Sequence, residues 1–595
     1  MVKPNLLFEV SYEVCNKVGG IYALLRSKAP YVLREYGDDY VMVGPYVQNN
    51  AAVEFEEQMT PEELSDVVDD LLKLGIKCHY GRWQMDGKPK AILVDHSGYM
   101  HEADDIKAGL WEYAQVDSLN ADNWFTDPLV WSTTVGMLLE RIVKKRKCKC
   151  RCIAHFHEWL TGGALLKLKQ DKSEISTVFT THATVLGRAL AEAGEPLYSI
   201  IGRGEDGQKN IDLAKWYNVL PKHTMEVACA KHADVFTTVS EVTAKEAAYF
   251  LDRTPDHLLL NGIDLYRYPP LDELVVQRRS KRRQMRDFLT SYFSRYYHMD
   301  FYNIRSMFIS GRYEFRNKGI DLFIDSLGML NRRMKKEKTG KNVVAFLWIP
   351  SNVKGEDFQV LKNKSLYEEM KDHIEELWPD IEDRMTHVLT DGDMPKSVLD
   401  DEDKQKLRKL AQHFVEKRGE TPPLCAFELA YPKEQDTIMQ ALWKNELLNR
   451  EEDKVKVIYY PSYLSTTDRL ISLDYGDATL TCDVGVFPSY YEPWGYTPLE
   501  TAAQGSLAIT TDCAGFGKFV EGKGKGIYVL KRCNRTWENM VKDLSEKLFE
   551  IVTLSREEMV ERRANARELA ALADWKELVK GYFKAYETLA GQKVR

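Results

Sequence analysis

A short stretch in the last fifth of the chain, YYEPWGYTPLE (residues 490–500), combines two carboxylates with an aromatic turn that contains proline. Its last four residues predict the start of a helix. Thr497 is the expected cap, Pro498 the first helical residue, and Glu500 follows the cap by three positions. Glu500 therefore has a structural explanation as a capping residue.

The amino end of that predicted helix is suited to an anion. Its unpaired amides would point back toward Gly495 and Tyr496, where they favour negative charge. Capping does not require Glu492, which precedes the turn in an aromatic-walled loop. We therefore predict that Glu492 acts on a ligand and that the anion lies beside it.

Two cations follow an apolar run in ISGRYEFRNKG, at Arg312 and Lys318. A forked guanidinium and a point-charged ammonium together suit a diphosphate. Solvated loops also carry such cations, so this pair alone does not separate the two interpretations. Tyr475, in LDYGD, is expected to be an exposed aromatic that could stack on a nucleobase, although surface tyrosines are common.

The N-terminal part holds a further turn in NKVGGIY, with Lys17, Gly19 and Gly20. Two glycines between a strand and a helix let the backbone approach a phosphate, and Lys17 would add charge. A turn without a ligand explains the glycines equally well. The spacing matches neither a dinucleotide fingerprint nor a P-loop.

Histidines and charged residues also follow two apolar runs, in AHFHEW and FTTHATVLGR. They are His155, His157, Glu158, His182 and Arg188. A single buried histidine is usually a core residue, but several polar groups at the carboxyl ends of strands favour a site. A metal is not expected, because His155 and His157 would share one strand face without a third ligand at fixed spacing.

Each of these motifs ends a short apolar run and precedes a helical pattern, which predicts parallel sheets covered on both faces. The alternation runs to about residue 260 and restarts near residue 305. We therefore expect an α/β chain of two doubly wound domains, residues 1–268 and 269–569, that face a cleft at their strand ends. Residues 354–450 are charge-rich and helical, and are expected to form an inserted oligomerisation element.

The composition is that of a globular protein, with 595 residues, 44% of them hydrophobic, and a net charge of -8. No concentrated basic field suggests nucleic acid as a partner. The N-terminus lacks the pattern of a signal peptide, and no apolar run reaches the ~18 residues of a membrane span. A soluble, cytoplasmic protein is expected.

Two local clusters have alternative explanations. CKCRC, with Cys148, Cys150 and Cys152, could hold a metal, but a strand that enters the core is favoured because no second cluster lies nearby. The basic run RRSKRRQMR (residues 278–286) could be a nuclear address or a polyanion patch. A solvated or subunit-packing helix face is favoured over both.

Taken together, the motifs resemble those of the eukaryotic-type glycogen synthases, glycosyltransferase family 3. FEVSYEVCNKVGGIY, AHFHEW, FTTHATVLGR, FTTVSEVTAKEA, GRYEFRNKG and VFPSYYEPWGYTPLE occur in that family's order, from about residue 5 to 590. The resemblance implies a GT-B fold of two Rossmann-like domains, with residues 570–595 crossing back to the first. It also implies a homotetramer and no metal or other cofactor. The implied reaction is retaining transfer of glucose from UDP-glucose to the non-reducing end of glycogen, an α-1,4-glucan.

The resemblance also assigns roles to single residues. Arg312 and Lys318 would bind the donor diphosphate, Glu500 the ribose, and Tyr475 the base. His182 would steady positive charge at the anomeric carbon, and Glu492 is the essential carboxylate. The remaining implied contacts are Lys17, Gly19, Gly20, Arg188, Gly495, Tyr496 and Thr497 on the donor side, and His157 and Glu158 on the acceptor side.

Two mechanisms fit a retaining reaction. Glu492 could be the nucleophile of a covalent intermediate, as in retaining glycosidases. The favoured alternative is front-face attack within an ion pair, in which the leaving diphosphate accepts the acceptor's proton and Glu492 orients and stabilises the sugar.

Regulation is expected to differ from that of the family. The chain lacks its serine-rich tails, so control by phosphorylation there is not expected. Its arginine-dense regulatory helix corresponds to SREEMVERRANARELAALADW, which keeps Arg556 and Arg563 but interleaves glutamates. That mixed charge predicts an ordinary solvated helix and weak or absent activation by glucose 6-phosphate.

Rival functions are an ADP-glucose-dependent glucan synthase and a glucan-binding relative without activity. The joint presence of Glu492, Arg312, Lys318, Lys17 and His182 argues against the inactive relative. A nicotinamide-dependent dehydrogenase is disfavoured, because neither half shows G-x-G-x-x-G after its first strand.

Overall fold

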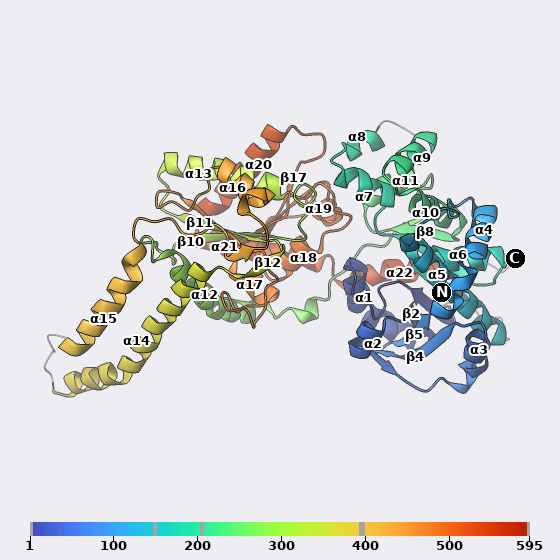
Figure 1. The fold of residues 1–595 in the computed structure, drawn as a ribbon, viewed down its shortest axis with the longest axis horizontal. Helices are drawn as coiled ribbons and strands as arrows, with labels where there is room; N and C mark the ends of the chain where they lie inside the picture. Colours follow the sequence, from blue (N-terminus) through green and yellow to red (C-terminus); the bar gives the residue numbers. More distant parts are fainter. Residues whose placement is uncertain (1–3, 147–150, 203–206, 392–398, 592–595) are drawn as a thin grey trace.

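The structure, a computed structural model, describes residues 4–146, 151–202, 207–391 and 399–591. It contains two large sheets, each covered by helices, side by side along the long axis of the molecule (Figure 1). We call the two parts the N-terminal lobe (β1–β9, α1–α11 and α22) and the C-terminal lobe (β10–β17 and α12–α21). Cys148 and Cys150 lie outside the described residues, whereas Cys152 is buried in a strand.

The N-terminal lobe is built on a nine-stranded sheet within the described residues. Its spatial order is β3 (Phe55–Glu57), β4 (Lys77–Trp83), β5 (Lys90–Asp95), β2 (Tyr40–Pro45), β1 (Leu6–Val10), β6 (Cys152–His157), β7 (Ser176–Thr181), β8 (Val235–Thr238) and β9 (His257–Leu258). The strands from β5 to β9 pair in parallel, and β1, β2 and β6 are buried along their whole length.

One edge of this sheet departs from the all-parallel expectation. β4 pairs antiparallel with both β3 and β5. The link from β4 to β5 is a short turn through Gly87, whose φ of 83° falls in the left-handed region. So short a turn can join only antiparallel neighbours, since parallel strands need a long crossover.

Helices cover both faces of the first sheet. They are α1 (Gly20–Tyr36), α2 (Gln48–Glu54), α3 (Glu62–Leu72), α4 (Ala103–Ala114), α5 (Asn123–Lys145), α6 (Gly162–Gln170), α7 (Val185–Glu192), α8 (Leu197–Ile201), α9 (Gly207–Trp216), α10 (Leu220–His232) and α11 (Glu241–Phe250).

The C-terminal lobe contains a six-stranded sheet in the described chain, with parallel pairing throughout. Its order is β14 (Val455–Tyr459), β11 (Asn342–Trp348), β10 (Ile304–Ser310), β15 (Val484–Val486), β16 (Leu507–Thr511) and β17 (Ile527–Leu530). The packing helices are α12 (Leu271–Phe293), α13 (Ile320–Glu337), α16 (Thr437–Lys444), α17 (Tyr475–Thr481), α18 (Tyr496–Ala503), α19 (Gly515–Val520), α20 (Trp537–Thr553) and α21 (Arg556–Ala571).

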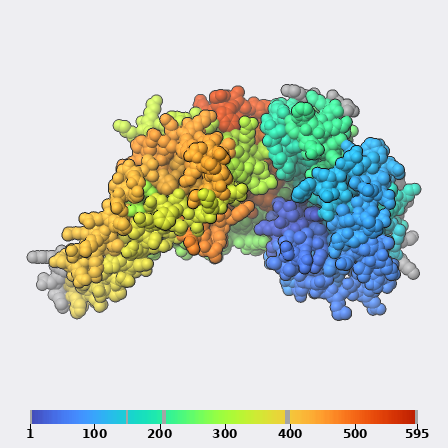
Figure 2. All heavy atoms as spheres, in the orientation of Figure 1, coloured from blue at the N-terminus to red at the C-terminus, as the bar shows by residue number. Residues whose placement is uncertain are grey.

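A helical arm extends from the C-terminal lobe. It consists of α14 (Phe358–Asp391) and α15 (Asp401–Phe414), which stand away from the body in Figures 1 and 2. A small antiparallel pair, β12 (Val353–Glu356) and β13 (Phe427–Leu429), frames its base. Large apolar side chains of the arm are exposed, with Leu389 at 83% and Trp378 at 59%. Large exposed apolar side chains of this kind can mark an interaction surface.

The last helix, α22 (Trp575–Gly591), returns to the N-terminal lobe and lies beside α1 (Figure 1). Trp575, Tyr582 and Tyr586 are buried in the same apolar cluster as Leu24 of α1. The Trp575 indole also donates to the Ser27 hydroxyl at 2.9 Å. The chain therefore passes twice between the lobes. None of the described helices has the length and apolarity needed to cross a membrane.

Candidate active site

A cavity of about 700 Å³ is lined by both lobes, at the carboxyl ends of their strands. The residues expected at a site that line it are Gly19, Gly20, Glu158, His182, Arg188, Arg312, Lys318, Glu492, Gly495, Tyr496 and Thr497. Parallel strands present their carboxyl ends at one edge of a sheet, so motifs far apart in the sequence meet here. Lys17, His157, Tyr475 and Glu500 do not line this cavity.

The residues of the C-terminal lobe that line this cavity form its C-terminal wall. In this wall the Lys318 ammonium lies 2.5 Å from the Glu492 carboxylate. Both side chains are 19% exposed. Lys318 ends the loop after β10, where Gly319 has a φ of 71°. A Cβ on Gly319 would stand 2.2 Å from the Pro488 carbonyl oxygen. Glycine therefore lets the two loops approach closely enough for the ion pair to form.

The helix after Glu492 begins earlier than predicted. α18 starts at Tyr496, and its cap is Gly495 with a φ of 107° and no capping side chain, so the assignment of Thr497 as the cap is wrong. Glycine enters the left-handed region without strain, so the chain turns into the helix before Thr497. Gly495, Tyr496 and Thr497 line the cavity, so the amino end of α18 does face it.

Tyr475 lies in an adjoining pocket of about 460 Å³, which Ser310, Trp348 and Tyr463 also line. Tyr475 is half-buried, not exposed as predicted. Its hydroxyl lies 2.9 Å from the Ser310 hydroxyl, and its ring meets Trp348 edge-on at 6.5 Å. Strands β10 and β11 supply these neighbours, which only the folded sheet brings to Tyr475.

The two cavities adjoin each other, since Arg312 and Thr497 line both of them. The Arg312 guanidinium lies 2.8 Å from Glu314, and its side chain is 69% exposed. Burial raises the pKa of Glu500, in the second turn of α18, to about 7. Within the described chain no hydrogen bond to the Glu500 carboxylate is found, which leaves it available to a ligand.

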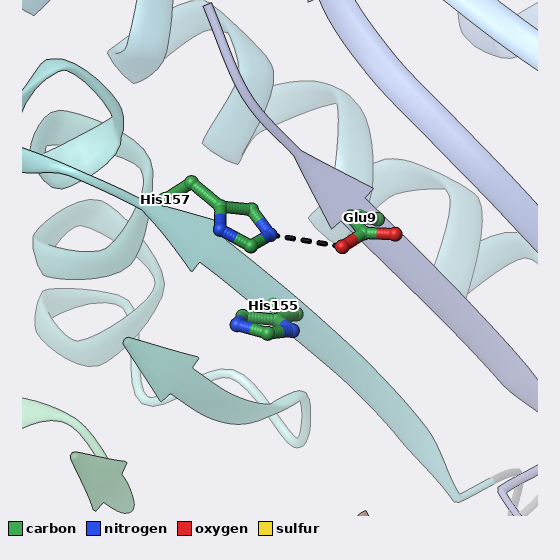
Figure 3. Close-up of side chains that lie close together, drawn as sticks. All are labelled: Glu9, His155 and His157. Atoms are coloured by element: carbon green, nitrogen blue, oxygen red, sulfur yellow. Dashed lines mark hydrogen bonds and ion pairs between the residues drawn. The ribbon is translucent and has the colours of Figure 1, made fainter. Parts of the chain in front are cut away.

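The residues of the N-terminal lobe that line the cavity form its N-terminal wall. In this wall His182 begins a chain of buried polar contacts. His182 Nε2 lies 2.9 Å from His157 Nδ1. His157 Nε2 in turn lies 2.9 Å from Glu9 Oε1, and this second contact is the one drawn in Figure 3. The Glu9 carboxylate also contacts Lys28 and Tyr40. His157 must donate to the Glu9 carboxylate, so its Nδ1 accepts from His182. His182 Nδ1 is then left as an acceptor.

Burial lowers the pKa of both His182 and His157, so both rings are neutral near pH 7. The sequence offers no third ligand at a fixed spacing from His155 and His157, but the fold brings Glu9 of β1 beside both histidines. The donor atoms are nevertheless occupied. His155 lies between Tyr586 and Thr180, and Lys28 supplies positive charge at Glu9. The cluster does not fit a metal.

Glu158 fixes the loop that carries His182. Its carboxylate accepts from the amides of His182 and Ala183, at 2.9 and 3.2 Å. Its own φ is 67°, which is uncommon for a residue with a side chain. Burial raises the pKa of Glu158 to about 7, against the opposing effect of Arg188. Glu158 therefore positions His182 through the backbone.

The glycine turn before α1 is arranged differently from the prediction. The Glu13 carboxylate accepts from the amides of Gly19 and Tyr22, at 2.7 and 2.9 Å. These amides were expected to bind phosphate, but Glu13 already occupies them. A Cβ on Gly19 would stand 3.1 Å from Glu13, so glycine makes room for the carboxylate. Lys17 is exposed in the same loop.

Some lining residues have no predicted role: Glu13, Trp159, Lys222, Asn261, Tyr491 and Trp494. The Lys222 ammonium lies 5.3 Å from the Trp159 ring centre. The Asn261 side-chain oxygen is buried without a hydrogen-bond partner in the described structure. Trp159 follows AHFHE directly, so its place beside the site could have been expected. Lys222 and Asn261 lie in segments without a recognisable signal.

A second cavity, of about 1120 Å³, lies between α12 and α21 and is strongly basic. The interpretation of α21 as an ordinary solvated helix is wrong for this face. Arg556 and Arg563 line the cavity, while the interleaved glutamates of α21 are exposed and do not. A separation of seven residues places both arginines on one helix face. The other lining cations are Arg278, Arg279, Arg282, Arg286, Arg305 and Lys341.

Charge inside this cavity is only partly compensated. Arg563 lies 2.5 Å and Arg282 2.6 Å from the buried Asp483 carboxylate. Burial lowers the pKa of Arg563 to about 10, which still leaves it charged at neutral pH. The basic run at 278–286 lies in α12, and four of its arginines, Arg278, Arg279, Arg282 and Arg286, line this cavity.

Comparison with known proteins gives matches over almost the whole chain. A family model described as "Glycogen synthase" matches residues 9–594. The glycogen (starch) synthase of Neurospora crassa is 35% identical over 98% of this chain and 83% of its own length. The liver glycogen (starch) synthase of Mus musculus is 33% identical over 98% of this chain and 82% of its own.

Among solved structures, one match is the catalytic domain of starch synthase IV from Arabidopsis thaliana, bound to ADP and acarbose. It aligns with a TM-score of 0.51 at 12% identity and covers 99% of both chains. A likeness at this identity concerns the fold alone.

Proposed function

This chain belongs to the glycogen synthase family, and from that premise we propose that it transfers glucose from UDP-glucose to the non-reducing end of an α-1,4-glucan. The resemblance drawn from the motifs and the expected GT-B fold are both confirmed. The protein is a retaining glycosyltransferase. The donor, the roles of single residues, the metal independence, the tetramer and the cytoplasmic location are proposals.

The two adjoining cavities support a nucleotide-sugar donor. We place the base beside Tyr475 in the smaller pocket and the glucose in the larger cavity, with the diphosphate where Arg312 and Thr497 join them. Arg312 is exposed enough to turn from Glu314 toward the diphosphate. Ribose hydroxyls would then supply Glu500 with the partners it lacks.

The single observation that carries this proposal is the contact between Lys318 and Glu492. A leaving diphosphate develops negative charge while the anomeric carbon develops positive charge. An ammonium and a carboxylate placed side by side match that separation of charge, and they need no metal to do so. Front-face attack remains the favoured mechanism, with a covalent bond to Glu492 as the alternative.

The N-terminal wall would complete the charge pattern. A neutral His182 with Nδ1 as an acceptor can bind a glucose hydroxyl without adding positive charge next to the oxocarbenium-like sugar. Trp159 and Lys222 offer an aromatic face and a donor for the acceptor glucan. These residues support the placement of the acceptor on the N-terminal side.

The helical arm supports the proposed homotetramer, because α14 exposes Trp378 and Leu389. Light scattering on the full chain would give the subunit number. A chain with the arm residues Trp378→Ser and Leu389→Ser is expected to dissociate, while a monomeric wild type would contradict the proposal.

The decisive experiment incubates the protein with glycogen and radiolabelled UDP-glucose or ADP-glucose, with and without EDTA. We expect label to enter α-1,4-linked chains from UDP-glucose, and EDTA to have no effect. Glu492→Gln should lose more than about tenfold in rate, corresponding to ~1.4 kcal/mol of barrier. Transfer from neither donor would favour an inactive glucan-binding relative, and transfer only from ADP-glucose would identify the other donor.

A further inference from the structure

Two cysteines lie against each other behind the loop that carries Glu492. Cys513 follows β16 and Cys533 follows β17, which are neighbouring parallel strands. Their sulfur atoms are 2.6 Å apart. We propose that Cys513 and Cys533 form a reversible disulfide, which makes this pair a covalent modification site next to the active site.

The backbone holds the two cysteines together independently of their side chains. The strands are in register, with Thr511 opposite Leu530. Just beyond them, the Asp512 carboxylate accepts from the amides of Arg532 and Cys533, at 2.8 and 3.2 Å. The segment that holds Cys533 is thus fixed to the residue before Cys513. A disulfide needs such proximity, because distant cysteines cannot be bridged without backbone movement.

The oxidant we propose is a low-molecular-weight disulfide such as oxidised glutathione. Cys533 is partly exposed, whereas Cys513 is fully buried and burial raises the pKa of its thiol. The Cys533 thiolate therefore attacks first, breaking the small disulfide and releasing one small thiol. The Cys513 sulfur then attacks Cys533 in the mixed disulfide and releases the second. Two protein thiols are oxidised, and one small disulfide becomes two thiols that take up the two protons.

The bond would join two segments that both support the Glu492 loop. Ala514 pairs with Glu492 as an isolated bridge, and the Gly515 amide donates to the Glu492 carbonyl at 3.0 Å. On the other side, the Arg532 guanidinium donates to the Pro488 carbonyl. Both ends of the turn from 488 to 492 are therefore held by residues beside a cysteine of the pair.

The same place also contacts the N-terminal lobe. The Tyr198 hydroxyl, from α8, donates to the carbonyls of Cys513 and Tyr490, at 3.2 and 3.1 Å. Loops that move during lobe closure often limit turnover. A cross-link here should restrict the Glu492 loop and lower kcat. That consequence rests on the proposed function, whereas formation of the bond does not.

A soft metal is the competing occupant, since Asp512, Cys513 and Cys533 lie within ligand reach of one another. The disulfide is favoured because the Asp512 carboxylate is already bound to two amides. A structural zinc site would also need a fourth ligand, and none of the described residues supplies one within that cluster.

The test uses the full chain, incubated with either oxidised glutathione or dithiothreitol, then alkylated, digested and mapped by mass spectrometry. We expect a peptide linked through Cys513 and Cys533 that disappears on reduction. Cys533→Ser should abolish it. Cys78→Ser, which removes another partly exposed cysteine, should not. Absence of the linked peptide in oxidised glutathione, or one zinc ion per chain by elemental analysis, would overturn the proposal.

Turnover is measured on the same samples. Oxidation should lower kcat at least about threefold in the wild type and in Cys78→Ser, and reduction should restore it. The kcat of Cys533→Ser should be the same before and after oxidation. A linked peptide without a change in kcat would refute the coupling to turnover. A protein without transferase activity in both the oxidised and the reduced sample would refute the proposed function. The linked peptide would still show whether the disulfide forms.

Discussion

The Tyr491 hydroxyl donates to the Glu246 carboxylate at 2.9 Å, across the boundary between the two lobes. Both residues are buried, and Tyr491 directly precedes Glu492. Glu246 lies in α11 and also accepts from the Thr184 amide, two residues after His182. One buried carboxylate thus connects the loops that carry Glu492 and His182.

Tyr491→Phe should therefore impair catalysis more than donor binding. The change removes the hydroxyl and keeps the ring, so Glu492 loses its link to the N-terminal lobe. We expect kcat to fall about tenfold with the donor KM changed by less than about twofold. Tyr217→Phe is a matched control, because it removes a 2.9 Å bond to the Glu195 carboxylate, and neither Tyr217 nor Glu195 lines the cavity that contains Glu492. Equal effects of the two changes would contradict this role.

Lys318 and Lys17 should differ sharply, although both are expected at the diphosphate. Lys318 contacts Glu492 in the cavity, whereas Lys17 is exposed and does not line it. Lys318→Ala should lower kcat/KM by about a hundredfold or more, since it removes charge at the leaving group. Lys17→Ala should lower it by less than about tenfold. Steady-state kinetics with the donor varied would decide, and an equal loss would show that Lys17 closes on the diphosphate.

Donor binding should weaken as the pH falls through about 7. Burial raises the pKa of Glu500 to about 7, so its carboxylate is ionised above that pH and protonated below it. Only the ionised group accepts hydrogen bonds from both ribose hydroxyls. The donor KM should therefore rise about tenfold per pH unit below 7 and level off above it.

The control for this pH dependence is Glu500→Gln, which should have a higher donor KM at neutral pH that no longer changes with pH. Glu158, whose pKa is also raised to about 7, remains in that variant. A KM that still follows the pH in Glu500→Gln would assign the titration to another group.

The basic cavity changes the expectation for glucose 6-phosphate. Weak activation was expected from the mixed charge of α21, but its glutamates face away from the cavity. A phosphate would meet Arg556 and Arg563 together with the arginines of α12. We now expect binding, with activity raised several-fold, and Arg563→Ala should abolish it.

Isothermal titration calorimetry with glucose 6-phosphate would test the expected binding, and activity assays would test the expected activation. Glu561→Ala serves as the matched control, since Glu561 is exposed on the same helix outside the cavity. Asp483 keeps Arg282 as a partner in Arg563→Ala, so the lobe should remain folded. Absence of binding to the wild type would restore the original expectation.

The sequence alone predicted much of the framework and of the C-terminal wall. Strands β1, β6, β7 and β10 each lie where a motif was predicted to follow a strand or an apolar run, because backbone preference and burial pattern are properties of neighbouring residues. Arg312, Lys318 and Glu492 could be placed together because parallel strands end at one edge. Local turn chemistry was less reliable, since Gly495 takes the cap position that Thr497 was expected to hold.

The remaining features depend on packing between residues far apart in the chain. Glu9 meets His157 across adjacent strands, Glu13 occupies the amides before α1, and Tyr491 reaches Glu246 in the other lobe. Nothing in the neighbourhood of these residues encodes such partners. The sequence by itself determined the family and most of the strand and helix pattern, and it supplied the candidate catalytic residues. Only the tertiary structure decided which carboxylates face a ligand and which are held by protein, because burial and hydrogen bonding are fixed when the two sheets and α22 pack together.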